Sequence, residues 1–191
     1  TNQTLQGVKM KTVAVLLADG FEEIEAVVPS DILKRLGYEV ITAGIKPGTV
    51  NGAHGIRATP QCGIADLDAD SLDAVFLPGG MPGSTNLRDC PAVIALLRKL
   101  YEAGKTVSAI CAAPIVLHKA GITGERRVTG YPGSEQMAPG LVYTGSRAET
   151  DRNVVTGKGP GAAFDFAYAL AAALGTTEEQ LKTLKFQMIA L

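Results

Sequence analysis

Short apolar runs, each followed by a helical pattern, constrain the fold of this chain more than any other feature. The clearest runs cover residues 12–17, 38–43 and 73–77, and a fourth opens the stretch 106–117. Strands that are apolar along their whole length are covered on both faces, which is typical of parallel sheets in α/β proteins. The sequence therefore predicts a mostly parallel sheet between two layers of helices.

The rest of the chain supplies the helices and several shorter strands. Apolar periodicity predicts helices over residues 21–36, 91–103, 162–174 and 177–189, with Thr176 and Glu179 as capping signals for the last one. Short strands are expected within 50–58 and over 126–129, 141–144 and 153–156. With 191 residues, we expect one domain over 10–191, preceded by a leader or extension over 1–9, with Met10 as the natural start.

Charge and cysteine content exclude several classes of partner. The formal net charge is −1 and no Lys/Arg-rich run is present, so a nucleic-acid partner is not expected. No apolar run approaches the roughly 20 residues of a membrane span. Cys62, Cys90 and Cys111 show no paired or metal-ligand spacing, which favours free thiols in a reducing, cytoplasmic setting.

Cys111 lies where an apolar strand meets a helix, and this position favours a reactive thiol. A cysteine at such a junction faces the amide groups of the helix N-terminus, which stabilise a thiolate. Ala109 and Ala113 are small, as a nucleophile elbow requires, and Pro114 suits the first turn of a helix. The alternative is a buried structural cysteine.

Glu25 is the second candidate, because it falls on an apolar stripe of the helix predicted over 21–36. The stripe contains Phe21, Ile24, Val28, Ile32 and Leu36. A carboxyl group on a core-facing stripe must be paired, hydrogen-bonded or protonated, which favours a functional group.

The two preceding acids have simpler interpretations. Asp19 and Glu22 have the spacing of a capping box, which gives Glu22 a structural role. Glu23 is expected to be solvated on the polar side of the helix.

Segments of unusual composition follow four of the predicted strands: an acidic segment at 19–25, glycine-rich segments at 78–83 and 157–161, and the Cys-Ala-Ala-Pro segment at 111–114. In an open parallel sheet, the carboxyl ends of the strands form the ligand site. We expect the backbone N–H groups of Gly79, Gly80 and Ala112 to form an oxyanion hole beside Cys111.

No cofactor or metal site is expected. Residues 157–162 match a dinucleotide-binding glycine pattern, but no βαβ unit surrounds them, and a proline-started helix explains them better. His54 and His118 lack ligand spacing, and His54 is expected to be an exposed loop residue. His118 lies about two helical turns beyond Cys111, which argues against its acting as a base.

Four segments in this order resemble the ThiJ/PfpI superfamily, in its branch of Parkinson-disease-protein-like and bacterial deglycase homologues. They are ADGFEEIEA at 18–26, LPGGMPG at 77–83, AICAAP at 109–114 and GPGAAFDFA at 159–167. The resemblance covers residues 11 to about 174. It implies a flavodoxin-like, class I glutamine amidotransferase-like three-layer sandwich with a nucleophile elbow, usually in a homodimer.

The resemblance also implies roles for individual residues. Cys111 corresponds to the nucleophilic or oxidisable thiol, and Glu25 to the acid that hydrogen-bonds it. Gly80 and Ala112 correspond to the oxyanion donors, and Arg35 resembles a family arginine near the site and the dimer interface.

One departure from the family pattern concerns histidine. Tyr131 stands where relatives commonly carry a histidine near the cysteine. This difference weakens the case for a protease-like Cys–His pair and leaves Glu25 as the acid–base partner of Cys111. We expect Gly79, Arg35 and Tyr131 to contact the substrate. His54 lies where some relatives carry an arginine.

The resemblance favours a cofactor-independent, cysteine-dependent enzyme acting on small reactive carbonyls, as a glyoxalase or a deglycase of glyoxal or methylglyoxal adducts. Its substrate is then a small aldehyde or a glycated molecule. A redox sensor or stress-response chaperone that uses an oxidisable Cys111 is the alternative from another class. A peptidase or amidase is the third hypothesis, and it requires a histidine near Cys111.

Overall fold

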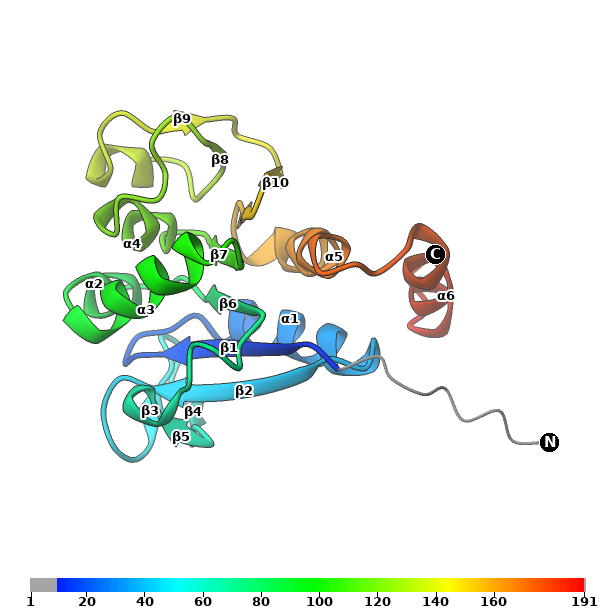
Figure 1. The fold of residues 1–191 in the computed structure, drawn as a ribbon, viewed down its shortest axis with the longest axis horizontal. Helices are drawn as coiled ribbons and strands as arrows, with labels where there is room; N and C mark the ends of the chain where they lie inside the picture. The colour runs from blue at the N-terminus through cyan, green and yellow to red at the C-terminus, as the bar shows by residue number, and fades with distance from the viewer. Residues whose placement is uncertain (1–9, 191) are drawn as a thin grey trace.

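A seven-stranded sheet forms the centre of the computed structural model, which describes residues 10–190 of the chain (Figure 1). The strand order is β10-β11-β7-β6-β1-β2-β5, and every neighbouring pair is parallel except β10–β11. The strands are β1 (Thr12–Leu17), β2 (Glu39–Gly44), β5 (Cys62–Gly63), β6 (Ala74–Leu77), β7 (Thr106–Ile110), β10 (Ala148–Asp151) and β11 (Val154–Gly157). The leader predicted over 1–9 lies outside the described residues.

Helices cover both faces of the sheet, which confirms the predicted three-layer α/β sandwich. One layer contains α1 (Glu23–Arg35) and α5 (Ala163–Ala173), with α6 (Glu178–Gln187) packed against both of them. The other layer contains α2 (Gly83–Arg88), α3 (Pro91–Glu102) and α4 (Pro114–Lys119) (Figure 1). Of the helices within residues 10–190, none combines the length and the apolar character that crossing a membrane requires.

Short elements extend the sandwich at its edges. The hairpin expected within 50–58 is present as β3 (Val50–Asn51) and β4 (Arg57–Ala58), and the parallel pair β8 (Arg127–Val128) and β9 (Val142–Tyr143) forms a separate two-stranded sheet. The strands β5 and β10 were not predicted from the sequence. Both are edge strands without a continuous apolar run. Single 3₁₀ turns occur at Ile64–Asp66, Ser134–Met137 and Pro160–Ala162.

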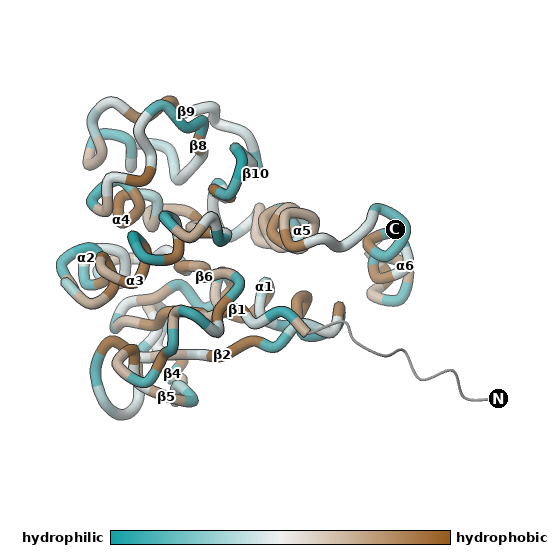
Figure 2. The backbone as a smooth tube through the Cα atoms, viewed as in Figure 1, coloured by the Kyte–Doolittle hydropathy of each residue, from teal (hydrophilic) through white to brown (hydrophobic). Residues whose placement is uncertain are grey.

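The side chains of β1 alternate between two hydrophobic cores. Val13 and Val15 pack on the side of α1 and α5, whereas Ala14 and Leu16 pack on the side of α2, α3 and α4, and all four are fully buried. Because strand side chains point to opposite faces in turn, a strand with two buried faces must be apolar at every position. Figure 2 shows the corresponding hydrophobic stretches along the sheet and along α5.

The start of α1 differs from the prediction in three respects. Glu22 is itself the N-cap, and its Oε2 accepts the backbone N–H of Glu25 at 2.8 Å. Asp19 is not part of a capping box, since it accepts from the backbone N–H of Asn51 at 2.9 Å and pairs with Lys46. Ile24, expected on the buried stripe, is 50% exposed, because the buried stripe of α1 is centred on Glu25, Pro29 and Leu33 and Ile24 lies on another side of the helix.

The cap of α6 also differs from the prediction, by one residue. Thr177 and Gln180 form the capping box, in place of Thr176 and Glu179. The hydroxyl of Thr176 instead bonds that of Tyr38, 2.7 Å away.

Phe166 lies at the centre of the core between the sheet and α5, and its truncation tests this packing. It is fully buried and meets Phe76 edge to face, with the ring centroids 6.1 Å apart. We expect Phe166→Ala to lower the free energy of unfolding by about 3–5 kcal/mol in urea titrations, since it leaves a cavity. Phe164→Ala on the same helix is the control, because Phe164 is 44% exposed, and its loss should stay below about 1 kcal/mol. Equal losses would contradict this packing.

Candidate active site

The carboxyl ends of three adjacent strands bring together Cys111, Glu25 and the Gly79–Gly80 pair. Cys111 follows β7, the glycines follow β6, and Glu25 lies in the first turn of α1 after β1. The neighbours β1, β6, β7 and β11 are parallel, so their ends meet at one edge of the sheet. The convergence expected from the sequence is therefore confirmed for these residues.

The backbone of Cys111 has the conformation of a nucleophile elbow. Its φ is 66°, in the left-handed region that costs a non-glycine residue about 1–2 kcal/mol. Three hydrogen bonds hold the turn: Cys111 N to Gly157 O at 2.8 Å, Tyr131 N to Cys111 O at 2.7 Å, and Ala113 N to Ile110 O at 3.0 Å. Strained backbone that is held in this way at the end of a strand is characteristic of reactive sites.

Gly79 lets Glu25 and Cys111 approach each other. Its N–H donates to Oε2 of Glu25 at 2.7 Å. A Cβ at position 79 would lie 2.6 Å from both that oxygen and the Cβ of Cys111, so a larger residue does not fit. This bond corrects one expectation, because the N–H of Gly79 serves the carboxyl group and is not available as an oxyanion donor.

The N–H groups of Gly80 and Ala112 face the sulfur of Cys111, and they partly oppose the rise in the pKa of its thiol that burial causes. Gly80 has a φ of 88°, and a Cβ there would collide with the carbonyl oxygen of Gly20, which explains the second glycine of the pair. Two amide donors aimed at the sulfur can also stabilise an oxygen anion that forms on a carbon bound to it.

Burial controls the charge of Glu25. Its side chain is fully buried, and desolvation raises its pKa from 4.5 to about 7, although the Cys111 thiol and the N–H of Gly79 oppose the shift. Its Oε1 makes no hydrogen bond of good geometry with any described residue. The negative charge of Glu22 adds to the rise. Glu25 is thus able to hold a proton near neutral pH.

Cys111 and Glu25 titrate as a pair. Burial and the Glu25 carboxylate raise the pKa of Cys111 to about 12, against the effect of the two amides. An ionised Glu25 therefore keeps the thiol neutral, and a thiolate forms at Cys111 when the proton resides on Glu25 instead. The position of Cys111 before a helix predicts that the amides favour the thiolate, whereas the opposing effect of burial and of the acid leaves no signal in the sequence.

The structure does not bring every predicted site residue to the sulfur. Arg35 lies ten residues after Glu25, about 15 Å along α1, and forms an exposed ion pair with Asp31 at 2.6 Å. Tyr131 is close to the elbow through its backbone, and its ring lines a pocket of about 230 Å³ with Lys158.

Both histidines of the chain are engaged elsewhere. The Nδ1 of His118 lies 3.1 Å from the hydroxyl of Thr123, and the Nδ1 of His54 lies 2.9 Å from Oε2 of Glu23. Neither bonds Cys111 in the described residues, so the peptidase hypothesis gains no support from a Cys–His pair.

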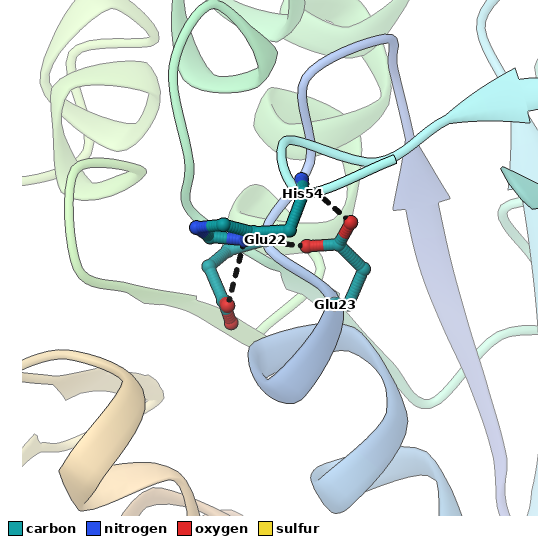
Figure 3. Close-up of side chains that lie close together, drawn as sticks. All are labelled: Glu22, Glu23 and His54. Carbon is teal, nitrogen blue, oxygen red and sulfur yellow. Dashed lines mark hydrogen bonds and ion pairs between the residues drawn. The ribbon is translucent and has the colours of Figure 1, made fainter. Parts of the chain in front are cut away.

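A cluster of Glu22, Glu23 and His54 lies beside the site and was missed by the sequence analysis (Figure 3). Glu23 is not solvated as expected. It is 6% exposed, and although burial raises its pKa, hydrogen bonds from His54 and Ile56 hold that pKa below its ordinary value. His54 is exposed as expected, and the Glu23 carboxylate raises its pKa. Glu23 and His54 lie 31 positions apart, in a helix and in a loop, so no spacing pattern in the sequence could have shown their contact.

The chain is similar in sequence and in fold to known proteins. The model of the DJ-1/PfpI family matches residues 11–173. A Caenorhabditis elegans protein named glutathione-independent glyoxalase is 35% identical over 177 residues, which cover 92% of this chain and 95% of the relative. A protein of Pyrococcus abyssi named as a deglycase is 34% identical over 152 residues, covering 78% of this chain and 90% of the relative. The crystal structure of a mutant DJ-1 superfamily protein from Salmonella typhimurium has a TM-score of 0.89 at 37% identity, covering 94% of this chain and 98% of that one.

The raised pKa of Glu25 predicts a pH-dependent difference in stability between the wild type and Glu25→Gln. The unfolded chain releases this proton near pH 4.5 and the folded chain near pH 7, so the proton stabilises the fold below pH 4.5, and this stabilisation is lost as the pH rises to 7. Glu25→Gln lacks this loss. Its free energy of unfolding relative to the wild type should rise by up to about 3 kcal/mol between pH 4.5 and 7, measured by urea titration. Parallel pH profiles would contradict the raised pKa.

Proposed function

The chain belongs to the DJ-1/PfpI family, and from this premise we propose that it is a cysteine-dependent enzyme acting on small reactive carbonyls. The reaction is that of a glyoxalase or a deglycase, with methylglyoxal or glyoxal, free or as adducts of thiols and amines, as the substrate class. The observation that carries the proposal is the contact of a buried, protonatable Glu25 with Cys111 at an elbow with two amide donors. The names of the two relatives support the substrate class.

The proposed mechanism uses one proton shared by Cys111 and Glu25. Transfer of the thiol proton to Glu25 gives a thiolate, which attacks the aldehyde carbon of methylglyoxal. The carbonyl electrons move to oxygen, and the N–H groups of Gly80 and Ala112 hold the resulting oxyanion of the hemithioacetal.

Glu25 then acts as the general acid and base of the rearrangement. It gives its proton to the oxyanion and then, as a carboxylate, takes the C1 proton and returns it to the neighbouring carbon C2. The hydroxyl proton passes from the C1 oxygen to the C2 oxygen in the same rearrangement, so the carbonyl shifts to C1. The product is a thioester of lactate on Cys111. Water hydrolyses the thioester, which restores the thiol and releases lactate, so the sum is methylglyoxal plus water giving lactate.

A homodimer is part of the proposal, because one face of the chain presents exposed apolar side chains. Ile24, Val27 and Ile56 are 50%, 62% and 64% exposed. Val27 and Ile56 line a groove of about 390 Å³ between α1 and β4. A second copy of the chain offers a matching apolar surface for this face.

Oxidation of Cys111 is the second candidate function, in a redox sensor of cytoplasmic stress. The Cys111 residue is 8% exposed, and its sulfur faces two amide donors and a protonatable acid. These groups can hydrogen-bond the oxygens of a sulfinate as well as a substrate oxyanion, which supports stable oxidation at this one thiol.

Turnover of methylglyoxal tests the proposed enzyme. We expect the purified protein to form lactate, Cys111→Ser to lose at least about 10³-fold in kcat/KM, and Glu25→Gln to lose about 10²–10⁴-fold. Cys90→Ser makes the same chemical change at a half-buried thiol and should retain activity. Absence of lactate with the wild type, or equal turnover by Cys111→Ser, would refute the enzyme.

Intact mass after mild peroxide treatment tests the sensor. Two oxygen atoms, about 32 Da, should be added at Cys111 before Cys62 or Cys90 reacts, and Cys111→Ser should show no such addition. Oxidation that starts at the other two thiols would exclude this role.

A further inference from the structure

Glu22, Glu23 and His54 direct their side chains to one point at the N-terminus of α1. The two glutamates begin the helix, and His54 lies in the turn of the β3–β4 hairpin that packs against it (Figure 3). One ligand atom from each residue lies within 4.8 Å of the other two. The proposed carbonyl chemistry uses none of these three side chains.

The two carboxylates are buried, whereas the imidazole is open to solvent. The side chains of Glu22 and Glu23 are 9% and 7% exposed, and that of His54 is 71% exposed. Two buried negative charges thus face one group that carries at most a single positive charge. Buried charge without full compensation is costly, so this cluster favours a further cation.

The hydrogen bonds leave one oxygen of these two carboxylates without a donor in the described residues. Oε1 of Glu23 accepts from the backbone N–H groups of His54 at 2.7 Å and Ile56 at 3.3 Å, and its Oε2 lies 2.9 Å from Nδ1 of His54. Oε2 of Glu22 accepts from the N–H of Glu25.

Oε1 of Glu22 points at the same Nδ1 from 3.6 Å and has no hydrogen-bond donor in the described residues. A single proton on Nδ1 serves only one of the two carboxylates. The oxygen of Glu22 therefore remains unpaired on a side chain that is nine-tenths buried.

We propose that Glu22, Glu23 and His54 form a binding site for one divalent transition-metal ion of the zinc type, separate from the thiol. The ion takes the place of the proton on Nδ1 and bonds that nitrogen, Oε1 of Glu22 and Oε2 of Glu23. An imidazole with two carboxylates is a donor set that suits Zn²⁺.

The distances between the donors fit such an ion. Bonds of about 2.0–2.2 Å place tetrahedral ligands about 3.3–3.6 Å apart. The distances from Nδ1 to the two oxygens, 2.9 and 3.6 Å, lie close to this range. The solvent-exposed side of His54 leaves the fourth position to water. The bound ion joins the β3–β4 hairpin to the start of α1.

Calorimetric titration with Zn²⁺ alone tests the site, together with Co²⁺ absorption. We expect one Zn²⁺ per chain, a higher Tm with metal, and a Co²⁺ spectrum without a thiolate charge-transfer band. His54→Gln and Glu23→Gln should each weaken Zn²⁺ binding at least about tenfold. Two controls should bind Zn²⁺ as the wild type does. Cys111→Ser removes the competing thiol, and His118→Gln makes the same change at the other histidine.

Every other outcome contradicts the site. Binding that is lost in Cys111→Ser, or a thiolate band with Co²⁺, would place the metal on the thiol. Binding that His54→Gln leaves unchanged would also overturn the proposal. Because His54 is exposed, this variant is expected to fold, and its Tm without metal checks this. It therefore decides the question even if Glu23→Gln unfolds. Loss of methylglyoxal turnover does not bear on these outcomes, since the metal site and the proposed reaction are measured separately.

Discussion

The structure of the site depends on the close approach of Glu25 and Cys111 across Gly79. The N–H of Gly79 binds the carboxyl group at 2.7 Å, and the missing side chain leaves room for the Cβ of Cys111 and the oxygen of Glu25. Three separate elements must meet for this contact: the start of α1, the loop after β6 and the turn after β7. The parallel order β1, β6, β7 places the ends of these elements at one edge of the sheet. The fold thereby brings three segments that are distant in the sequence together, and the acid and the thiol come into contact.

The same contact explains why one arrangement supports two candidate functions. A buried acid with a raised pKa can give a proton to an oxyanion in catalysis or to a sulfinate after oxidation. The amides of Gly80 and Ala112 can stabilise both the oxyanion of catalysis and the sulfinate, because both species carry a negatively charged oxygen close to the sulfur. What separates the two functions is the reagent that reaches Cys111, a carbonyl carbon or a peroxide.

Sequence patterns predicted the layers and the acid–thiol pair, because both depend on local periodicity and on the ends of strands. Glu25 was found because an acid on an apolar helix stripe is conspicuous, and the structure places it at full burial. The bond from Gly79 to Glu25 could not be predicted, because a glycine run does not show which N–H group points where. The burial of Glu23 depends on His54, a loop residue 31 positions away, and the short edge strands β5 and β10 depend on their neighbours for their pairing. Tertiary contacts of this kind leave no trace in local spacing.

Direct titration of the Cys111 thiol is the measurement that bears most closely on the acid–thiol pair. The alkylation rate of Cys111, followed by intact mass from pH 5 to 11 in the wild type and in Glu25→Gln, reports its thiolate directly. If the two groups share a proton, the wild-type rate should show a step near pH 7, where the pair loses its first proton, and Glu25→Gln should lose this step and ionise at a single pKa below 12. Identical profiles with one ordinary thiol pKa of about 8.5 in both proteins would contradict the account.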